Sequence, residues 1–307
     1  MDLKYLIILL TFLHSGLHAI TASDDWSYSG EHGPEHWPGI CVTGKMQSPI
    51  NIATENIVKT DFGALKFIKY DSEFSWEVTN NGHSVQIKLV AAPTYQLVRI
   101  PIHLEGANLP STYILDHIHF HWPAEHTMDG KRDVLELHFV HYNNQYKNAS
   151  IASQHKNGVA VVATLFELNK ENNSEIMPIL ERMRPLSNNT GANVTSITTK
   201  IIPRFFLPKD HTTYYHYDGS LTTPGCQETV MWYILDEKLL ISDMQLNIVK
   251  NIGTINGTLG YNYRPIQTLG ERKVYHHLTG YSIAITHSYN LLYVCFSLFL
   301  STLLYLK

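Results

Sequence analysis

The stretch that decides the fold is HIHFHW, residues 117–122, which ends the longer segment TYILDHIHFHW, residues 112–122. Successive side chains of a strand point to opposite faces, so His117, His119 and His121 share one face if this segment is a strand. Ile118 and Phe120 then share the other face, which can pack into a core. Three protonated imidazoles side by side would repel one another. The pattern therefore predicts a strand whose histidines are held neutral.

Other segments with the same period of two predict further strands. They are residues 84–90, 95–104, 134–142, 158–168 and 228–235. Asn81-Gly82 and Asp129-Gly130 are typical hairpin turns. Residues 174–186 and the segment after Ser242, a candidate N-cap, predict short helices. We expect a mostly β (α+β) single domain with a large twisted, mainly antiparallel central sheet of about ten strands and short peripheral helices.

Composition limits the range of partners. The 307 residues carry a formal charge of only −4 and 16% charged residues, so no basic surface indicates nucleic acid. The oligomeric state does not follow from these figures. The 18 histidines are unusual, but their number alone says little about metal binding.

Both ends of the chain resemble export signals. Residues 1–22 contain one lysine, a short apolar run and small residues, which predicts a secretory signal peptide. Residues 289–307 form an apolar tail without a basic flank, and residues 271–288 supply small residues for lipid attachment. This arrangement favours a GPI anchor over a membrane-spanning tail. The domain itself is expected over residues 23–270.

Cysteine usage agrees with an oxidising compartment. Cys295 lies in the tail that anchoring would remove, which leaves Cys41 and Cys226 as a pair. We expect a disulfide between them. The chain also carries sequons for N-glycosylation at Asn148, Asn172, Asn188, Asn193 and Asn256.

The alternating histidines have a chemical use. Catalytic zinc takes about three protein ligands and leaves one position for water. A pair of histidines on one strand supplies two ligands, and His138 on the following strand can supply the third, with Glu136 and Val140 on the same face. Glu136 can orient His138, and His117 can support His119 as a partner that does not bind the metal. The same pattern also suits an incidental surface site, or iron or copper in a barrel oxygenase that binds a carboxylate directly.

Several motifs together resemble the α-class carbonic anhydrases. In chain order they are WSYSGEHGPEHWPGIC, QSPINI, NNGH, HFHW, EHTMDG, ELHFVHY, GSLTTPGC and NYRPIQ, which cover almost the whole expected domain. The resemblance implies a zinc lyase that reversibly hydrates carbon dioxide to bicarbonate and a proton by attack of zinc-bound hydroxide. It implies a Zn²⁺ cofactor held by His119, His121 and His138.

The resemblance also implies roles for residues around the metal. Thr222 would accept a hydrogen bond from the hydroxide and donate one to Glu125, and Thr223 would help to place bicarbonate. His83 would be the proton shuttle, which suits a group titrating near neutral pH. The wall that receives carbon dioxide would consist of Val140, Val161, Leu221 and Trp232. The residues that order the water chain would be Tyr28, Asn81 and Gln86.

Three positions depart from the family pattern. His117 stands where the family usually has glutamine, the loop between Trp122 and Glu125 is shorter than usual, and Gly225 replaces a usual proline. The first change predicts weaker support for His119. We expect an active enzyme at the extracellular face of the plasma membrane, or a secreted one. The competing interpretation is a recognition module that keeps the fold without the activity.

Overall fold

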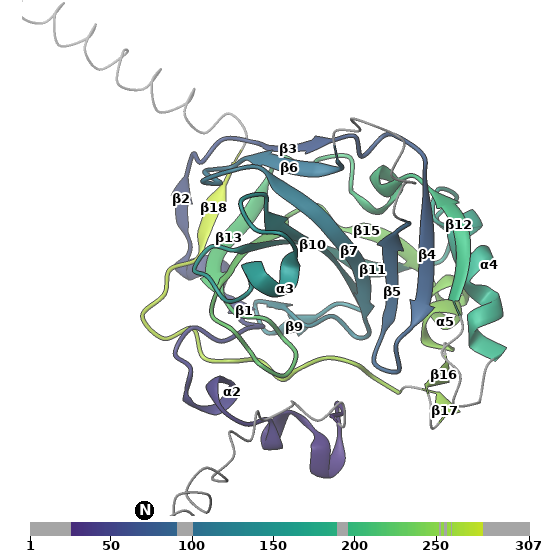
Figure 1. Ribbon diagram of the computed structural model, residues 1–307, viewed down its shortest axis with the longest axis horizontal. Helices are drawn as coiled ribbons and strands as arrows, with labels where there is room; N and C mark the ends of the chain where they lie inside the picture. The colour runs from purple at the N-terminus through teal and green to yellow at the C-terminus, as the bar shows by residue number, and fades with distance from the viewer. Residues whose placement is uncertain are drawn as a thin grey trace, which may run out of the picture.

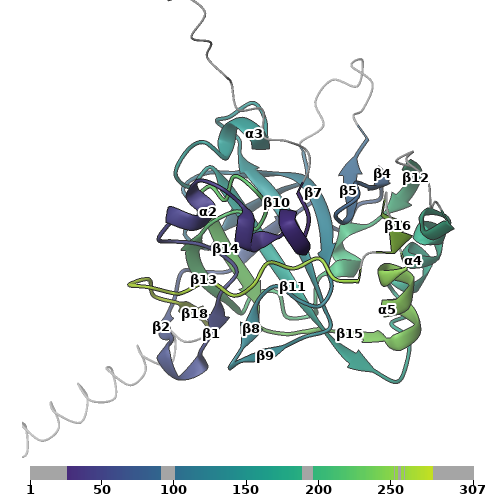
Figure 2. The same ribbon diagram turned by 90° about the horizontal axis from the view of Figure 1, so that it is seen from below.

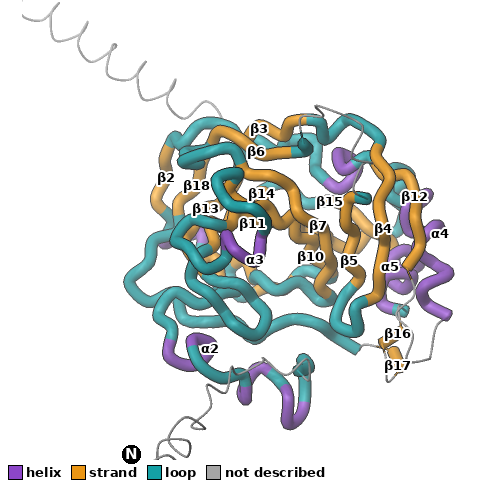
Figure 3. The backbone as a smooth tube through the Cα atoms, viewed as in Figure 1, coloured by secondary structure: helices purple, strands orange, loops and turns teal. Residues whose placement is uncertain are grey.

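A large twisted sheet forms the centre of the molecule, and short helices lie outside it (Figures 1 and 3). This computed structural model describes residues 26–90, 101–188, 196–251, 253–254, 257–258 and 260–278. The predicted signal peptide and apolar tail lie outside the described residues. Among the described residues, no helix has both the length and the apolar character needed to cross a membrane.

Thirteen strands build the large sheet. They are β2 (Val58–Thr60), β3 (Leu65–Ile68), β4 (Phe74–Asn80), β5 (Val85–Leu89), β6 (His103–Gly106), β7 (Tyr113–His121), β10 (Leu135–Asn143), β11 (Val159–Asn169), β12 (Ser196–Ile201), β13 (Tyr214–Gly219), β14 (Val230–Leu235), β15 (Leu239–Ser242) and β18 (Tyr275–His277). A second sheet contains β1 (Asn51–Ile52), β8 (Thr127–Met128) and β9 (Lys131–Arg132), and a hairpin pairs β16 (Gly253–Thr254) with β17 (Gly257–Thr258).

The helices are short and peripheral, as Figure 3 shows in purple. The α-helices are α2 (Ile40–Thr43), α3 (Ala149–Ala152), α4 (Met177–Met183) and α5 (Asp243–Lys250). Single 3-10 turns cover Gly30–His32, Pro34–His36, Thr54–Asn56, Arg184–Asn188 and Pro203–Phe206. In both ribbon views α4 and α5 lie beside the edge formed by β12 and β4 (Figures 1 and 2).

The strand order places the histidine strands in the middle of the sheet. The order is β12-β4-β5-β7-β10-β11-β14-β13-β18-β2, with β6 and β3 extending from β7, and β15 pairing with β11. The pairs β11–β14, β11–β15 and β18–β2 are parallel, whereas the other pairs of this sheet are antiparallel. Central strands lie between hydrogen-bonded neighbours, so their side chains are held more firmly than those of edge strands or loops.

Alternation along β7 and β10 separates the core from the site. Ile118, Phe120, Leu137 and Phe139 are buried in the larger apolar core on one face of the sheet. Val140 belongs to a second apolar cluster, and it shares its face with the histidines. The fold therefore places the ligand face against a separate, smaller apolar lining.

The main features of the predicted fold are confirmed. The domain is mostly β and mainly antiparallel, with short helices, and Ser242 caps α5 in a capping box with Gln245. The sheet has more strands than the predicted ten because strands near one end of it, such as β2 and β18, have only three residues. So short a strand gives little periodic signal. Since β18 pairs with β13 and β2, the folded unit extends past the boundary expected at residue 270.

Candidate metal centre

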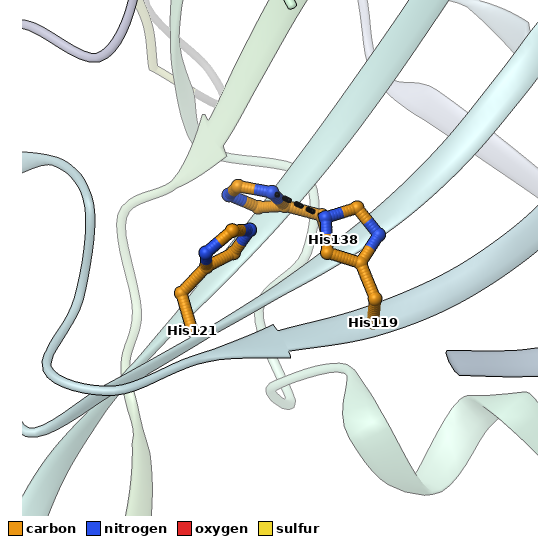
Figure 4. A group of neighbouring side chains, drawn as sticks. All are labelled: His119, His121 and His138. Carbon is orange, nitrogen blue, oxygen red and sulfur yellow. Dashed lines mark hydrogen bonds between the residues drawn. The ribbon is translucent and has the colours of Figure 1, made fainter. Parts of the chain in front are cut away.

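Three histidines from two neighbouring strands converge on one point. In the antiparallel pair β7–β10, His138 lies opposite His119, and Glu136 lies opposite His121. One ligand atom from each of His119, His121 and His138 lies within 4.8 Å of the others. Figure 4 shows the three rings turned toward a shared space, with His119 and His121 rising from one strand and His138 from the next. The strand register brings the three residues together.

Each ring has one nitrogen that faces the shared space and an outer nitrogen that points away from it. In two of the rings, a hydrogen bond made by the outer nitrogen shows which nitrogen faces the space. His121 donates its Nδ1–H to the carbonyl of Asn262 at 2.6 Å, so its Nε2 carries the lone pair. His138 donates its Nε2–H to Glu136 Oε1 at 2.7 Å, which leaves the lone pair on Nδ1. The Nε2 of His119 lies 3.2 Å from that Nδ1 (Figure 4, dashed line). The inward atoms are therefore Nε2, Nε2 and Nδ1.

Burial keeps these imidazoles neutral. It lowers the pKa of His121 to about 4, and it lowers the pKa of His119 well below the ordinary value. Burial also lowers the pKa of His138, although the Glu136 carboxylate acts in the opposite direction. The three rings are uncharged at neutral pH, so they do not repel one another and can act as ligands.

Glu136 organises the floor of the site. Its carboxylate accepts hydrogen bonds from the backbone N–H groups of Glu125 and His126, both at 2.8 Å, and from the His126 and His138 rings, both at 2.7 Å. Burial opposes its ionisation, but His126, His138 and these donors hold the pKa of Glu136 well below its usual range. An ionised carboxylate only accepts hydrogen bonds, which fixes the tautomer of His138.

His117 differs from its expected role as an acceptor for His119. Its ring stacks on the His119 ring with centroids 5.0 Å apart, and its Nδ1–H donates to Asp116 Oδ2 at 2.8 Å. His119 Nδ1 is buried and has no hydrogen-bond partner among the described residues. The outer nitrogen of His119 thus lacks the acceptor that the other two rings possess.

The donor set fits zinc. Three neutral imidazole nitrogens in a closed group match the ligands of catalytic zinc. The buried His121 Nε2 has no hydrogen-bond partner among the described residues, which is the state expected of a ligand atom. Glu136 is engaged by four N–H donors and is thereby unsuited to bind a metal directly. This disfavours the iron or copper site with a carboxylate ligand that the sequence alone left open.

Thr222 and Glu125 lie beside the histidines. Glu125 is fully buried, and its Oε1 accepts the backbone N–H of Arg264 at 2.9 Å. Burial raises the pKa of Glu125 to about 7, while the His138 ring, the Arg264 amide and the Thr222 hydroxyl act to lower it. Its Oε2 accepts no hydrogen bond of ordinary geometry from the described residues. This oxygen is available to the neighbouring Thr222 hydroxyl.

A cavity of about 340 Å³ opens above the three histidines. Every residue predicted to contact the substrate or the water chain lines it, together with His83, His117 and Thr222. The predicted substrate and water-chain residues in this lining are Thr223, Val140, Val161, Leu221, Trp232, Tyr28, Asn81 and Gln86. Glu125 and Glu136 are absent from its surface because both lie beneath it, fully buried. One side of the cavity is apolar, and the other side carries polar groups.

His83 occupies the polar side of the cavity. Its ring stacks on Trp26 with centroids 3.7 Å apart, and partial burial lowers its pKa. Asn81 holds the turn that carries it, because Asn81 Oδ1 accepts the backbone N–H groups of His83 and Ser84. Asn81 therefore supports His83 directly, besides lining the cavity.

Sequence reasoning missed several supporting residues. The most connected is Asn262, whose side chain accepts from Trp122 N at 2.6 Å and donates to the carbonyls of Phe120 and His83. His126 and Arg264 were also missed. All three lie inside motifs that carry the resemblance, EHTMDG and NYRPIQ, but nothing in the local spacing of Asn262 and Arg264 indicates a contact with residues about 140 positions away.

Cys41 and Cys226 form the predicted disulfide, which joins residues 185 positions apart. Cys226 follows the Thr222 loop, so the bridge ties that loop to α2. Gly225 has φ +99°, a conformation that proline cannot adopt. The backbone at Gly225 therefore differs from any backbone that could hold the proline usual at this position in the family.

The sequons fall in different environments. Asn148 is exposed and caps α3, with its Oδ1 accepting from Ile151 N, and Asn172 is exposed beside Ser242. Asn188 ends a 3-10 turn, and its side chain is not described. Asn193 and Asn256 lie outside the described residues. Glycosylation at these sites remains a prediction.

Comparisons with known proteins agree with this geometry. The model of the eukaryotic-type carbonic anhydrase family matches residues 32–278. Carbonic anhydrase 6 of Mus musculus is 35% identical over 277 residues, which cover 83% of this chain and 82% of that protein. Carbonic anhydrase 4 of Rattus norvegicus is 33% identical over 260 residues, with 79% of each chain covered. This chain, with its three converging imidazoles, therefore belongs to the eukaryotic-type carbonic anhydrase family.

Proposed function

We propose that this protein is a zinc-dependent carbonic anhydrase that reversibly hydrates carbon dioxide to bicarbonate and a proton. The observation that carries the proposal is the convergence of three neutral imidazoles, two of them fully buried, at the base of a half-apolar cavity, beside a hydroxyl and a carboxyl. Family membership supports the same reaction.

His119, His121 and His138 would hold the metal. Zinc in such a three-histidine site supplies a water whose pKa falls to about 7. Glu136 and Asn262 fix two of the rings through their outer nitrogens, so the ligand atoms are in place before the metal binds. No side chain has to act as a strong base near the substrate.

The apolar side of the cavity would receive carbon dioxide. Val140, Val161, Leu221 and Trp232 line it, and an uncharged, apolar molecule loses little on leaving water for such a wall. Bicarbonate is charged and fits this wall poorly, so it would leave toward Thr223 and solvent. Because the substrate is apolar and the product is charged, the apolar wall would retain carbon dioxide and favour the release of bicarbonate.

Thr222 and Glu125 would act as a gate. When the Thr222 hydroxyl donates to Glu125, its oxygen can only accept from the ligand in front of it. A ligand with a proton on the bound atom satisfies that oxygen, whereas an anion without a proton faces an unfavourable lone pair. The gate would hold the nucleophile in one orientation, which is the main way that positioning lowers a barrier.

His83 would carry the released proton to solvent. Its ring lies on the polar side of the cavity with Tyr28, Asn81 and Gln86, and a lowered pKa favours its return to the neutral form. The Trp26 ring supports one position of the imidazole by stacking. A histidine suits this task because its unperturbed pKa is about 6.5.

Stopped-flow hydration of carbon dioxide tests this function. We would use protein truncated before Tyr281, with and without a chelator that removes zinc, and readdition of zinc as the control. The proposal requires rapid hydration that is lost on chelation and restored by zinc. A rate no faster than buffer in protein with bound zinc would instead favour the recognition module.

We also propose an extracellular location with a GPI anchor. The disulfide fits an oxidising compartment, and the apolar ends of the chain have the composition of a signal peptide and an anchor signal. Phosphatidylinositol-specific phospholipase should release the protein from membranes of expressing cells. Retention after treatment would contradict the anchor and favour a spanning tail.

A further inference from the structure

The segment that carries Glu125 is short. Only Pro123 and Ala124 separate Trp122 from Glu125. At its beginning the segment is held by Asn262, which accepts from Trp122 N at 2.6 Å and donates its own N–H to Trp122 O at 3.1 Å. With so few residues, any shift at the other end would move the Glu125 carboxyl.

Arg132 holds that other end. Its Nη1 donates to the carbonyl oxygens of Ala124 and Glu125, the latter at 2.9 Å. Arg132 belongs to β9, and it pairs with Thr127 of β8, two residues past Glu125, so its backbone is anchored in the small sheet beside the loop. A planar guanidinium can bridge two carbonyls at once, whereas an ammonium offers a single point of charge.

The same guanidinium links the loop to the segment on its other side. Its Cζ lies 4.3 Å from the centre of the Tyr263 ring. Tyr263 directly precedes Arg264, whose backbone N–H binds Glu125 Oε1 at 2.9 Å. One arginine thus contacts the backbone of Glu125 and the residue next to the donor that orients its carboxyl.

A neighbouring ion pair fixes the strand from outside. Lys238 Nζ lies 2.9 Å from Asp133 Oδ2, and the Asp133 carbonyl accepts the backbone N–H of Ala124 at 3.0 Å. Lys131, on the other side of Arg132, is exposed. The two adjacent basic residues of β9 therefore differ sharply in their surroundings, which makes Lys131 a matched control.

We propose that Arg132 is a positioning residue of the Thr222–Glu125 gate. Its guanidinium holds the short loop so that Glu125 Oε2 stays directed at the Thr222 hydroxyl. The inference rests on the proposed function of the site. Arg132 then contributes to the reaction without touching the substrate or binding the metal. It does so by holding the short loop, and with it the Glu125 carboxyl, in position.

The test compares Arg132→Ala, Arg132→Lys and Lys131→Ala with the wild type. Zinc content and thermal unfolding establish that each variant is folded and loaded. Affinities for hydrosulfide, which carries a proton, and for iodide, which does not, are then read from the visible spectrum of the Co²⁺-loaded proteins. Carbon dioxide hydration is measured separately on the zinc forms.

A loosened gate should discriminate less between the two anions. We expect the ratio of hydrosulfide to iodide affinity to fall roughly tenfold in Arg132→Ala, with a comparable loss of kcat/KM, because misplacement of about 1 Å can cost as much as 100-fold. Arg132→Lys should lie between this variant and the wild type. Lys131→Ala should match the wild type.

The outcomes separate the two proposals. An inactive, zinc-loaded wild type would overturn the proposed function, while the anion ratio would still report on the gate. An active wild type whose ratio and kcat/KM are unchanged in Arg132→Ala would overturn the role of Arg132. If Arg132→Ala does not fold, Arg132→Lys decides, because a ratio equal to that of the wild type would contradict the positioning role.

Discussion

The outer nitrogen of His119 is the weak point of the metal site at the scale of single residues. His121 donates to a carbonyl and His138 to a carboxylate, but His119 Nδ1 has no partner among the described residues. The neighbouring His117 directs its own N–H to Asp116. A missing outer partner typically lowers metal affinity, since it leaves the ring free to rotate and less basic.

Replacing His117 with the residue usual in the family should strengthen zinc binding. In His117→Gln, the side-chain oxygen could accept from His119 Nδ1. We expect zinc to dissociate about 10-fold more slowly, within the range of effects seen for such partners. Dissociation is measured by transfer of zinc to a coloured chelator. Equal or faster loss of zinc would contradict this explanation, and His117→Ala serves as the control without an acceptor.

Removing the His83 imidazole should slow proton release but not the reaction with carbon dioxide. We expect kcat of His83→Ala to fall about 100-fold in weak buffer, a typical contribution of a proton-transfer group, with kcat/KM little changed. Added imidazole should restore kcat, because a soluble base can accept the proton. His36→Ala, an exposed histidine outside the cavity, is the control. A parallel fall of kcat and kcat/KM would contradict a shuttle.

Single residues also show how far the sequence could predict the site. Strand alternation placed His119 and His121 on one face with His138 on the following strand, and the family resemblance singled them out as the ligands. The Asn262 carbonyl and the Arg132 guanidinium could not be predicted in this way. Their contacts depend on how distant loops pack, and a backbone carbonyl leaves no mark in a sequence.

At the scale of elements, the strands with clear alternation were predicted and the edges were not. The strands β7, β10 and β11 have nine to eleven residues, enough to display a period of two. The break in register opposite Val140 and His141, a bulge at Asp116 of β7, is not visible in the sequence. His141 follows Leu137 and Phe139 on the core face of β10 by ordinary alternation, and its ring contacts Tyr70.

The capping box of α5 gives a prediction at this scale. Ser242 accepts the N–H of Gln245 through its hydroxyl, and that hydroxyl donates to Asn172 Oδ1 at 2.6 Å. Ser242→Ala should lower the free energy of unfolding by about 1 kcal/mol. Urea unfolding measures the change, and hydration activity should stay at the wild-type level. Ser242→Thr keeps a hydroxyl and is the control, and equal stability of the alanine variant would contradict the cap.

At the scale of the whole molecule, buried neutral histidines make stability depend on pH. His141 is fully buried, accepts from the Tyr70 hydroxyl at 2.5 Å and donates to Ala160 O at 3.2 Å. Burial lowers its pKa to about 3. In the unfolded chain the imidazole takes up a proton below pH 6.5, its ordinary pKa, whereas in the folded chain it stays neutral until the pH approaches about 3. The stabilising contribution of the neutral imidazole is therefore complete above pH 6.5 and is lost as the pH falls toward 3.

This dependence can be measured with His141→Gln, which cannot take up a proton. Between pH 6.5 and pH 3 the wild type should lose up to about 1.4 kcal/mol per pH unit more than the variant, the slope for one proton. The variant can be less stable at pH 7, where the fit of the imidazole matters, but its slope should be smaller. Parallel urea-unfolding curves across this range would contradict a neutral, buried His141.

The whole account depends on one divalent ion held by imidazoles from β7 and β10, and zinc stoichiometry tests it most directly. Metal content and carbon dioxide hydration should be measured together on the wild type, on His138→Ala and on His141→Gln, a histidine of the same strand outside the ligand group. The prediction is one zinc per chain with rapid hydration in the wild type and in His141→Gln, and loss of both in His138→Ala. Undiminished hydration in His138→Ala, or an active wild type without zinc, would contradict it.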